Sequence, residues 1–370
     1  MRHQKSMASK TNAAVNKPSE RRPTRAIVWT KQPVRRRVER NTLESSAYRL
    51  PSEILSMIFK YTTEVAGGPV NDARHWQLNP GRLHGPGWFV LLWVCSKWRR
   101  VLIADASLWA ACYSQYPKLQ ETFLARAGLV PLTYRHTAYE PRLSPYSAMF
   151  RDDDEQLAKF FFDTPFERCS EIYVSDGRGN DVTDYIFQLS ALSIEHPLRQ
   201  LRKLHLETWP WNWSGGIASM LCQGRDACTI IGEQLEDVYF ENCWTIVSSP
   251  MLKRLASVFK TNQLTRPTIH VFYRAMKVMC GNTLTHLELT NPIGGSYRDD
   301  VRQYTADPIA LPSLTHMSLL GYAPYIANIL RIITWPTDST KLKVKTIVGD
   351  GPQQSFLDEE DILSLCCSRS

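Results

Sequence analysis

The 370-residue chain lacks several features of secreted, membrane-spanning and metal-binding proteins. Its nine cysteines include no Cys-x-x-Cys pair, and Cys222 and Cys228 form an isolated pair with five residues between them. This spacing is unlike that of zinc ligands, so we expect no metal site and reduced, buried thiols. The longest apolar run, GWFVLLWVC (residues 87–95), is far shorter than the roughly 20 residues of a membrane span. With no apolar signal core near the N-terminus, the sequence predicts an intracellular protein without a transmembrane segment.

Motifs of common enzyme classes are also missing from the sequence. It contains no Gly-x-Ser-x-Gly nucleophile elbow, and the turn DGRGND (176–181) lacks the spacing and the lysine of a phosphate-binding loop. The acidic cluster DDDEQ (152–156) precedes an apolar stretch, as expected at a helix N-terminus, where the helix dipole favours negative charge. We therefore expect no catalytic residues, no cofactor and no enzymatic activity.

Basic residues are concentrated at the N-terminal end. Residues 1–47 contain twelve Lys and Arg but three Asp and Glu, whereas the other 323 residues contain 32 basic and 33 acidic residues. Because few large apolar side chains accompany this charge, we expect residues 1–47 to form a disordered basic tail. Such a tail can contact nucleic-acid phosphates without sequence preference, whereas the electrically balanced remainder gives no support for nucleic-acid binding.

Two basic clusters within this tail bear on localisation. Arg21-Arg22 is the first cluster, and Arg35-Arg36-Arg37, twelve residues further on, is the second. The arrangement is typical of a bipartite nuclear-import signal, but a solvated basic arm without a receptor accounts for it equally well. We therefore expect a cytoplasmic protein, a nuclear protein, or one found in both compartments.

Residues 50–112 show the spacing of short helices around a long loop. In LPSEILSMIFKYTTE (50–64), Pro51 suits a first helical turn and apolar residues recur at helical spacing. The stretch 67–87, rich in Gly, Pro and Asn, is expected to be a loop. A unit of about sixty residues buries little surface on its own. Its apolar face must therefore be covered, either by the rest of this protein or by a partner.

Beyond residue 115, short runs with strand-like alternation recur. Five of them fit the pattern apolar-x-x-apolar-x-apolar, with starts at residues 169, 201, 235, 284 and 314. In each unit the last two apolar side chains are expected to pack on one side, while the residues between them face outward. The spacings of 32, 34, 49 and 30 residues exceed the roughly 20–29 of regular leucine-rich repeats. The sequence therefore predicts an irregular, leucine-rich-repeat-like α/β solenoid.

Three further segments belong to this expectation. Strands are predicted in PLTYRHTAY (131–139) and LKVKTIVG (342–349), and the acidic amphipathic segment SFLDEEDILSLC (355–366) is predicted to be a capping helix. His286 and His316 occupy equivalent positions in two units that begin Leu-Thr-His. We expect both to face outward near each other. A metal or acid–base pair is conceivable there, but no third ligand or nucleophile accompanies them, so surface histidines without chemistry are expected.

A tryptophan-rich segment follows the second of these units. In WPWNW, Trp209, Trp211 and Trp213 alternate, so that all three face one way if the chain is extended. They are candidate contacts for a protein substrate. The alternative is that they fill the space beneath a long loop.

Several motifs within residues 50–109 resemble the F-box, and specifically the F-box-like domain abundant in mushroom-forming fungi. The matching residues are Leu50-Pro51, Glu53-Ile54-Leu55, Ile58-Phe59, Val94-Cys95, Trp98-Arg99 and Leu108-Trp109. The resemblance covers residues 50–134, and the later repeats are similar only in style. The loop at 67–87 departs from the compact F-box because it is longer.

The resemblance implies a substrate receptor of an SCF-type ubiquitin ligase. Proteins of this family dock through the F-box on a Skp-type adaptor, which joins them to a cullin, and their repeats bind the substrate. They have no catalytic residues of their own. By resemblance, the adaptor-binding residues are Leu50, Pro51, Ile54, Leu55, Ile58, Phe59, Leu91, Val94, Cys95, Trp98, Leu108 and Trp109. Of these, Trp98 and Trp109 are also expected to hold the short helices together.

The predicted organisation has three parts. A disordered basic tail (1–47) precedes a three-helix F-box-like unit (48–113), and an irregular leucine-rich-repeat-like domain with a C-terminal capping segment follows (114–370). The alternative to a ligase subunit is a scaffolding repeat protein, whose F-box-like helices pack internally and engage no ligase.

Overall fold

The computed structural model describes residues 46–65, 87–115, 119–138, 164–176, 180–208, 228–260, 266–294 and 302–347. The chain divides into two units, Met1–Leu50 and Pro51–Ser370. In the first unit, the described part contains one short helix, α2 (Ser46–Arg49). Five expectations fall outside the described residues: the basic tail up to residue 45, the long loop except its last residue, the helix N-terminus at DDDEQ (152–156), the three tryptophans of WPWNW, and the capping segment 355–366.

The second unit begins with a group of short helices. They are α3 (Ser52–Val65), η2 (Gly87–Trp93), α5 (Ser96–Ala104), α6 (Ala106–Ala111), η3 (Tyr113–Gln115) and α7 (Gln120–Ala127). Side chains define where two of them start, because Cys95 Sγ accepts from the Trp98 amide and Asp105 accepts from the Leu108 amide. Gly128, with φ of 57°, follows the last residue of α7 and allows the chain to leave the helix.

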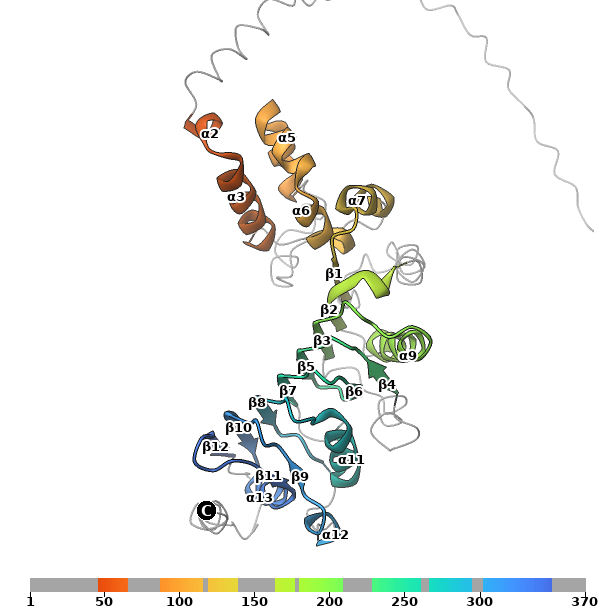
Figure 1. Cartoon of the computed structure of the whole chain (residues 1–370), viewed down its shortest axis with the longest axis vertical. Helices are drawn as coiled ribbons and strands as arrows, with labels where there is room; N and C mark the ends of the chain where they lie inside the picture. Colours follow the sequence, from red (N-terminus) through yellow and green to blue (C-terminus); the bar gives the residue numbers. More distant parts are fainter. Residues whose placement is uncertain are drawn as a thin grey trace, which may run out of the picture. The chain divides into compact units, whose positions relative to one another are not determined.

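Eight parallel strands form the main sheet (Figure 1). They are β1 (Leu132–Ala138), β2 (Cys169–Asp176), β3 (Lys203–Thr208), β5 (Asp237–Glu241), β7 (Arg254–Val258), β8 (His286–Thr290), β10 (His316–Gly321) and β12 (Lys341–Thr346). Their order in the sheet is their order in the chain, and each neighbouring pair is parallel. Each strand therefore needs a connection that brings the chain back to the same edge of the sheet.

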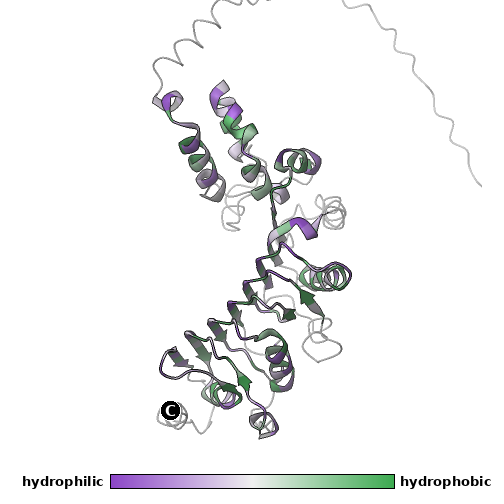
Figure 2. Ribbon diagram, in the orientation of Figure 1, coloured by the Kyte–Doolittle hydropathy of each residue, from purple (hydrophilic) through white to green (hydrophobic). Residues whose placement is uncertain are grey.

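Helices and two small sheets lie on one side of the main sheet, which we call its inner side (Figure 1). The helices are α9 (Asn180–Glu195), α11 (Ile269–Met279), α12 (Arg302–Thr305) and α13 (Ala323–Ile332), and a short helical turn, η7 (Phe166–Arg168), precedes β2. The small sheets pair β4 (Thr229–Ile231) with β6 (Ile246–Ser248), and β9 (Ile309–Ala310) with β11 (Ile333–Thr334). Hydrophobic residues recur along α9 and α11, which contact β4 and β6 respectively (Figure 2).

Burial alternates along the strands as the apolar pattern predicts. In β3, Leu204 and Leu206 are buried, and in β5, Val238 and Phe240 are buried. The residues between them stay partly exposed on the other face, which we call the outer face of the sheet. All seven strands expected from the sequence are present. The mixed α/β class is therefore confirmed, and the structure adds that its strands form one large parallel sheet.

One strand of the sheet was missed by the sequence pattern. The interval of 49 residues between the units at 235 and 284 contains β7, which pairs with both β5 and β8. Leu252 and Leu255 fill the first two apolar positions of the pattern, but the third is occupied by Ser257. Ser257 is nevertheless fully buried, so it takes an inward position without being apolar.

Asparagines end two of the strands. Asn242 after β5 and Asn291 after β8 have positive φ values of 52° and 48°, a conformation that asparagine tolerates better than most residues. Their side-chain Nδ2 atoms donate to a carbonyl at the end of the preceding strand segment. Asn242 donates to the Thr208 carbonyl at 2.8 Å, and Asn291 donates to the Phe259 carbonyl at 3.2 Å. These side chains therefore turn the chain out of the strand and bind it to its neighbour.

Within the described ranges, no helix is long and apolar enough to cross a membrane.

Candidate functional site

Helix α3 has two different apolar faces. One faces the interior, where Leu55 and Phe59 are 0% exposed and the Phe59 ring meets the Trp98 ring edge-on, with 5.3 Å between centroids. The other face follows the spacing i, i+3, i+4 and i+7, so its side chains lie side by side. Their exposed fractions are 40% for Ile54, 66% for Met57, 38% for Ile58 and 67% for Tyr61. We call these four residues the α3 row.

Elements that pack against α3 carry further exposed apolar side chains. Helix α5 and turn η2 both contact α3, and Arg99 Nε of α5 donates to the Leu92 carbonyl of η2 at 2.8 Å. The exposed large apolar side chains of these two elements and the link between them are Val90, Trp93, Val94 and Ile103. Three neighbouring elements thus leave large apolar groups in water, which is typical of an interaction site.

Buried aromatic side chains hold the short helices together. Trp109 Nε1 donates to the Leu102 carbonyl at 2.8 Å, which joins α6 to α5. The Trp109 ring also meets Trp88 at 5.4 Å and Phe123 at 5.0 Å between centroids, and the Arg126 guanidinium lies over it at 4.2 Å. Trp109 therefore fixes four helical elements relative to one another.

The junction between α5 and α6 is built around one carboxylate. Asp105 accepts from Ser107 Oγ at 2.6 Å and from the Leu108 amide at 3.3 Å, which caps α6. Partial burial acts to raise the pKa of Asp105, but hydrogen bonds from Ser107 and Ser56 and the nearby charge of Lys60 outweigh it and lower the pKa. Because Ser56 and Lys60 belong to α3, Asp105 also links α3 to this junction.

The structure divides the residues that the sequence assigned to adaptor binding. Four are exposed, four are buried within the second unit, three are partly buried, and Leu50 is the last residue of the first unit. The exposed residues are Pro51, Ile54, Ile58 and Val94, and the buried residues are Leu55, Phe59, Leu108 and Trp109. The partly buried residues are Leu91, Cys95 and Trp98. Sequence reasoning missed Met57 and Tyr61, although helical spacing from Ile54 would have found both.

The outer face of the main sheet carries a row of stacked side chains from four neighbouring strands. Arg135, Tyr173, His205 and Tyr239 occupy matching positions on β1, β2, β3 and β5. The Arg135 guanidinium lies 5.0 Å from the Tyr173 ring centroid, and the Tyr173 and His205 centroids are 5.7 Å apart. His205 stacks on Tyr239 at 4.3 Å with 22° between their planes. No sequence motif indicated this row, because it exists only when the strands are in register.

Carboxylates adjoin the Tyr239 end of this row. Tyr239 donates to Glu241 Oε2 at 2.7 Å, and Lys260 also pairs with Glu241. His205 Nε2 lies 3.9 Å from Glu207 Oε2, and the adjacent imidazole is the main reason that the pKa of Glu207 is lowered. Burial raises the pKa of the Tyr239 phenol, and the nearby negative charges of Glu241, Glu207 and Glu288 raise it further. Three carboxylates therefore lie near the Tyr239 phenol.

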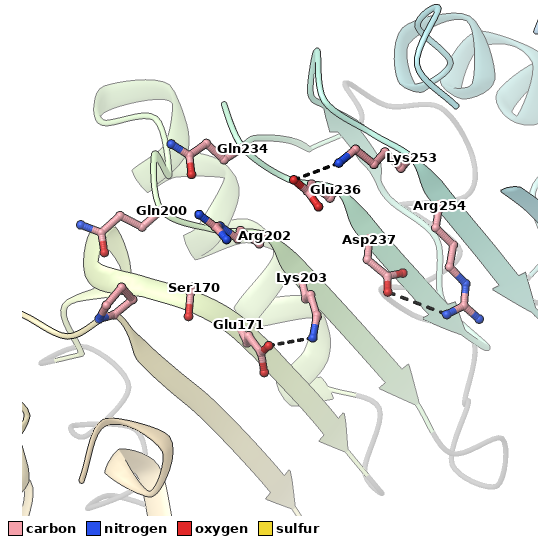
Figure 3. A pocket seen from close by; sticks show the side chains of 11 residues that line it. Ser170, Glu171, Gln200, Arg202, Lys203, Gln234, Glu236, Asp237, Lys253 and Arg254 are labelled. Carbon is pink, nitrogen blue, oxygen red and sulfur yellow. Dashed lines mark hydrogen bonds and ion pairs between the residues drawn. The ribbon is translucent and has the colours of Figure 1, made fainter. Parts of the chain in front are cut away.

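A shallow depression of about 690 Å³ lies at the end of the sheet where β2, β3, β5 and β7 begin (Figure 3). Six of its seven charged side chains form pairs of opposite sign: Glu171 with Lys203 at 2.8 Å, Glu236 with Lys253 at 3.2 Å, and Asp237 with Arg254 at 3.8 Å. Arg202 is the seventh. The three pairs are neutral and Arg202 adds one positive charge, so the depression carries little net charge.

His286 and His316 lie in register on β8 and β10, both exposed on the outer face as expected. Their rings stack with centroids 4.4 Å apart and planes 6° apart. Each Nδ1 is 2.9 Å from the hydroxyl of the preceding threonine, Thr285 or Thr315. In the part of the chain that the structure describes, three or more metal-ligating side chains do not come together, either at these histidines or elsewhere.

Comparison of the whole chain with protein-family models, with curated proteins and with solved structures finds no match. The geometry of the second unit, with its exposed helical row and its outer sheet face, is therefore the basis for a functional assignment.

Proposed function

We propose that this protein is the substrate-recognition subunit of an SCF-type ubiquitin ligase. In this proposal the F-box-like segment (48–113) docks on a Skp-type adaptor, and a leucine-rich-repeat-like domain (114–370) binds a protein substrate. The observation that supports it most is the α3 row, an exposed apolar helix face within the segment that carries the F-box-like motifs.

The energetics of the α3 row support a role in docking. Fully burying a large apolar side chain stabilises a complex by roughly 1.5–3 kcal/mol relative to leaving it in water. Four such side chains at i, i+3, i+4 and i+7 spacing are the pattern by which an amphipathic helix packs into the groove of a partner. Exposed Trp93 adds an amphipathic ring of the kind that often carries binding energy at interfaces.

The buried motif residues have a supporting role in this proposal. Leu55, Phe59, Leu108 and Trp109 are inside the second unit, so they cannot contact an adaptor directly without unfolding. They position the exposed residues by holding α3, α5 and α6 together. The proposed adaptor contacts are therefore the α3 row with Trp93 and Val94.

Features of the sheet support a leucine-rich-repeat-like architecture for the second part. Strands follow one another in chain order, and the pattern apolar-x-x-apolar-x-apolar places its last two apolar residues inward. Cys243 occupies the Asn/Cys position three residues after the final apolar residue of its unit, and its thiol donates to the Leu206 carbonyl at 3.3 Å. Irregular spacing and the two small sheets make the proposed repeats degenerate.

The experiment is a pull-down of the full-length protein with the Skp-type adaptor of its source organism. Ile54→Asp/Ile58→Asp is the test variant, because both side chains are partly exposed and their loss leaves Leu55 and Phe59 in place. Leu192→Asp/Ile194→Asp, two exposed apolar positions on α9, is the matched control. We expect the unmodified protein and the control to bind, and the test variant to lose binding.

Two results would contradict the proposal. One is no adaptor binding by the unmodified protein. The other is equal binding by the Ile54→Asp/Ile58→Asp variant, which would place any contact outside the α3 row. Melting curves of all three proteins show whether the substitutions leave the fold intact.

A scaffolding function is the second candidate, and the continuity between helices and sheet favours it. The Arg135 amide of β1 donates to Ser114 Oγ at 2.7 Å, and α6 also contacts β1. If the helices serve mainly to cover this end of the sheet, their removal unfolds the remainder. A truncation that starts at residue 116 and still melts cooperatively would exclude this candidate.

A further inference from the structure

We propose that the outer face of the sheet around Tyr239 binds an arginine- or lysine-bearing segment of a partner protein. This inference builds on the proposed function, because it names the chemical class of the protein substrate. It depends on three features of the outer face: an aromatic ring at the end of a stack, an excess of carboxylates around it, and a small residue beside it.

The aromatic feature is the Tyr239 ring. His205 stacks on one side of it, and the register neighbour on its other side, in β7, is Ala256. Ala256 cannot continue the stack, so the row of rings that begins at Tyr173 ends at Tyr239. An aromatic face that carries partial negative charge attracts a cation placed over it. The next residue in the same register is Glu288 of β8, two strands away from Tyr239.

The outer face is acidic over this region. Among the outward positions of β2, β3, β5, β7 and β8, five residues are acidic and two are basic: Glu171, Glu207, Asp237, Glu241 and Glu288 against Lys203 and Arg254. Lys260, which follows β7, adds one further cation by pairing with Glu241. The excess is therefore negative, and Glu241, Glu207 and Glu288 are the carboxylates whose charge acts on Tyr239.

An arginine of the chain itself shows that this surface accommodates a guanidinium. Arg254 lies between two carboxylates, with Nη1 at 3.8 Å from Asp237 and Nη2 at 3.9 Å from Glu288. Both distances are long, Arg254 and Glu288 are about half exposed and Asp237 is about one-third exposed, so these ion pairs are weak and can be exchanged. A basic side chain of a partner that stacks on Tyr239 would meet Glu288 and Glu207 in the same way, with the added contact to the ring.

The charge reverses at the far end of the same face. Strand β12 presents Lys341, Lys343 and Lys345 outward, all three exposed. A basic segment is therefore attracted to the β3–β8 region and repelled from β12, which gives the bound segment a preferred position.

The test measures fluorescence anisotropy of a labelled peptide, Gly-Arg-Gly-Arg-Gly-Arg, against the full-length protein, with Gly-Glu-Gly-Glu-Gly-Glu as the comparison. We expect the arginine peptide to bind, more tightly at low salt, and the glutamate peptide not to bind. Tyr239→Leu keeps an apolar side chain but removes the ring, and is expected to weaken binding about two- to fivefold. Glu207→Gln/Glu288→Gln is expected to weaken it roughly three- to tenfold and to reduce the salt dependence.

Glu195→Gln, an exposed acidic position at the end of α9, is the matched control and is expected to bind like the unmodified protein. Equal binding of both peptides, or unchanged binding by the Tyr239 and Glu207/Glu288 variants, would overturn the inference. The Ile54→Asp/Ile58→Asp variant separates this inference from the proposed function. If this variant loses adaptor binding and keeps binding of the arginine peptide, the proposed function and this inference are both supported. If no form of the protein binds the adaptor but the Tyr239 and Glu207/Glu288 variants weaken peptide binding, the inference is supported and the ligase assignment fails.

Discussion

Phe59 and Trp98 meet edge to face, with 5.3 Å between their ring centroids and 64° between their planes. This contact joins α3 to α5, and Phe59 is fully buried in it. The preceding residue, Ile58, is 38% exposed. Consecutive side chains of an α-helix point about 100° apart, because 3.6 residues complete one turn. One step along α3 therefore separates a residue that holds the fold from one that faces the solvent.

Substitutions at these two adjacent positions are expected to act on different properties. Phe59→Ala leaves a cavity beside Trp98 and is expected to lower the free energy of unfolding by about 3–5 kcal/mol. Ile58→Asp changes a surface side chain and is expected to lower it by about 0.5 kcal/mol. Urea denaturation of the full-length variants measures both values. Similar losses for the two variants would show that the two faces of α3 are not distinct.

Asp105 is expected to stabilise the α5–α6 junction as a helix cap. Asp105→Ala removes the acceptor for the Leu108 amide and is expected to cost about 1 kcal/mol, whereas Asp105→Ser keeps an acceptor and is expected to cost less. Because the pKa of Asp105 is lowered in the folded state, its charged form stabilises the fold above the ordinary value of 3.8. This contribution is lost as the pH falls through the lowered pKa. Thermal melts of wild type and Asp105→Ala from pH 6 to pH 2 should therefore converge at the acid end.

His286, whose ring stacks on His316, is expected to titrate unlike an isolated histidine. Partial desolvation, the like charge of His316 and the charge of Arg254 lower the pKa of His286 below 6.5. The folded state then binds this proton less readily than the unfolded state, so the associated stability is present above pH 6.5 and is lost as the pH falls. An NMR titration of the imidazole resonances should show the His286 pKa rise in the His316→Ala variant. An unchanged pKa would show that the two rings do not interact electrostatically.

Ser257 is expected to be a site at which the protein can be stabilised. Its side chain is fully buried in β7, and its hydroxyl makes no hydrogen bond within the described part of the chain. Burying a hydroxyl without a partner costs roughly 1–3 kcal/mol. Ser257→Ala removes that cost with little change in volume and is expected to raise the free energy of unfolding by about 1 kcal/mol. A loss of stability would mean that the hydroxyl has a partner in solution.

The same residue explains a limit of the sequence pattern. The pattern found the strands in which all three key positions are apolar, and it predicted the inward and outward sides of β3, β5, β8 and β10 correctly. It missed β7 because Ser257 breaks the pattern. Pairing with β5 and β8 on both sides supplies the backbone hydrogen bonds that make this segment a strand, and that information is not local.

The apolar pattern was sufficient to locate seven of the eight strands of the main sheet in their chain order, since its period follows from strand geometry. The sequence also predicted that His286 and His316 lie near each other, because both of their units begin with Leu-Thr-His, and their rings do stack. Packing between elements determines which apolar residues of α3 are buried, because Leu55 and Ile58 are equally hydrophobic and differ only in what packs against them. The tertiary structure alone placed Tyr173, His205 and Tyr239 in one row, because strands of a parallel sheet bring together residues more than thirty positions apart, and their register is set by packing of the opposite face.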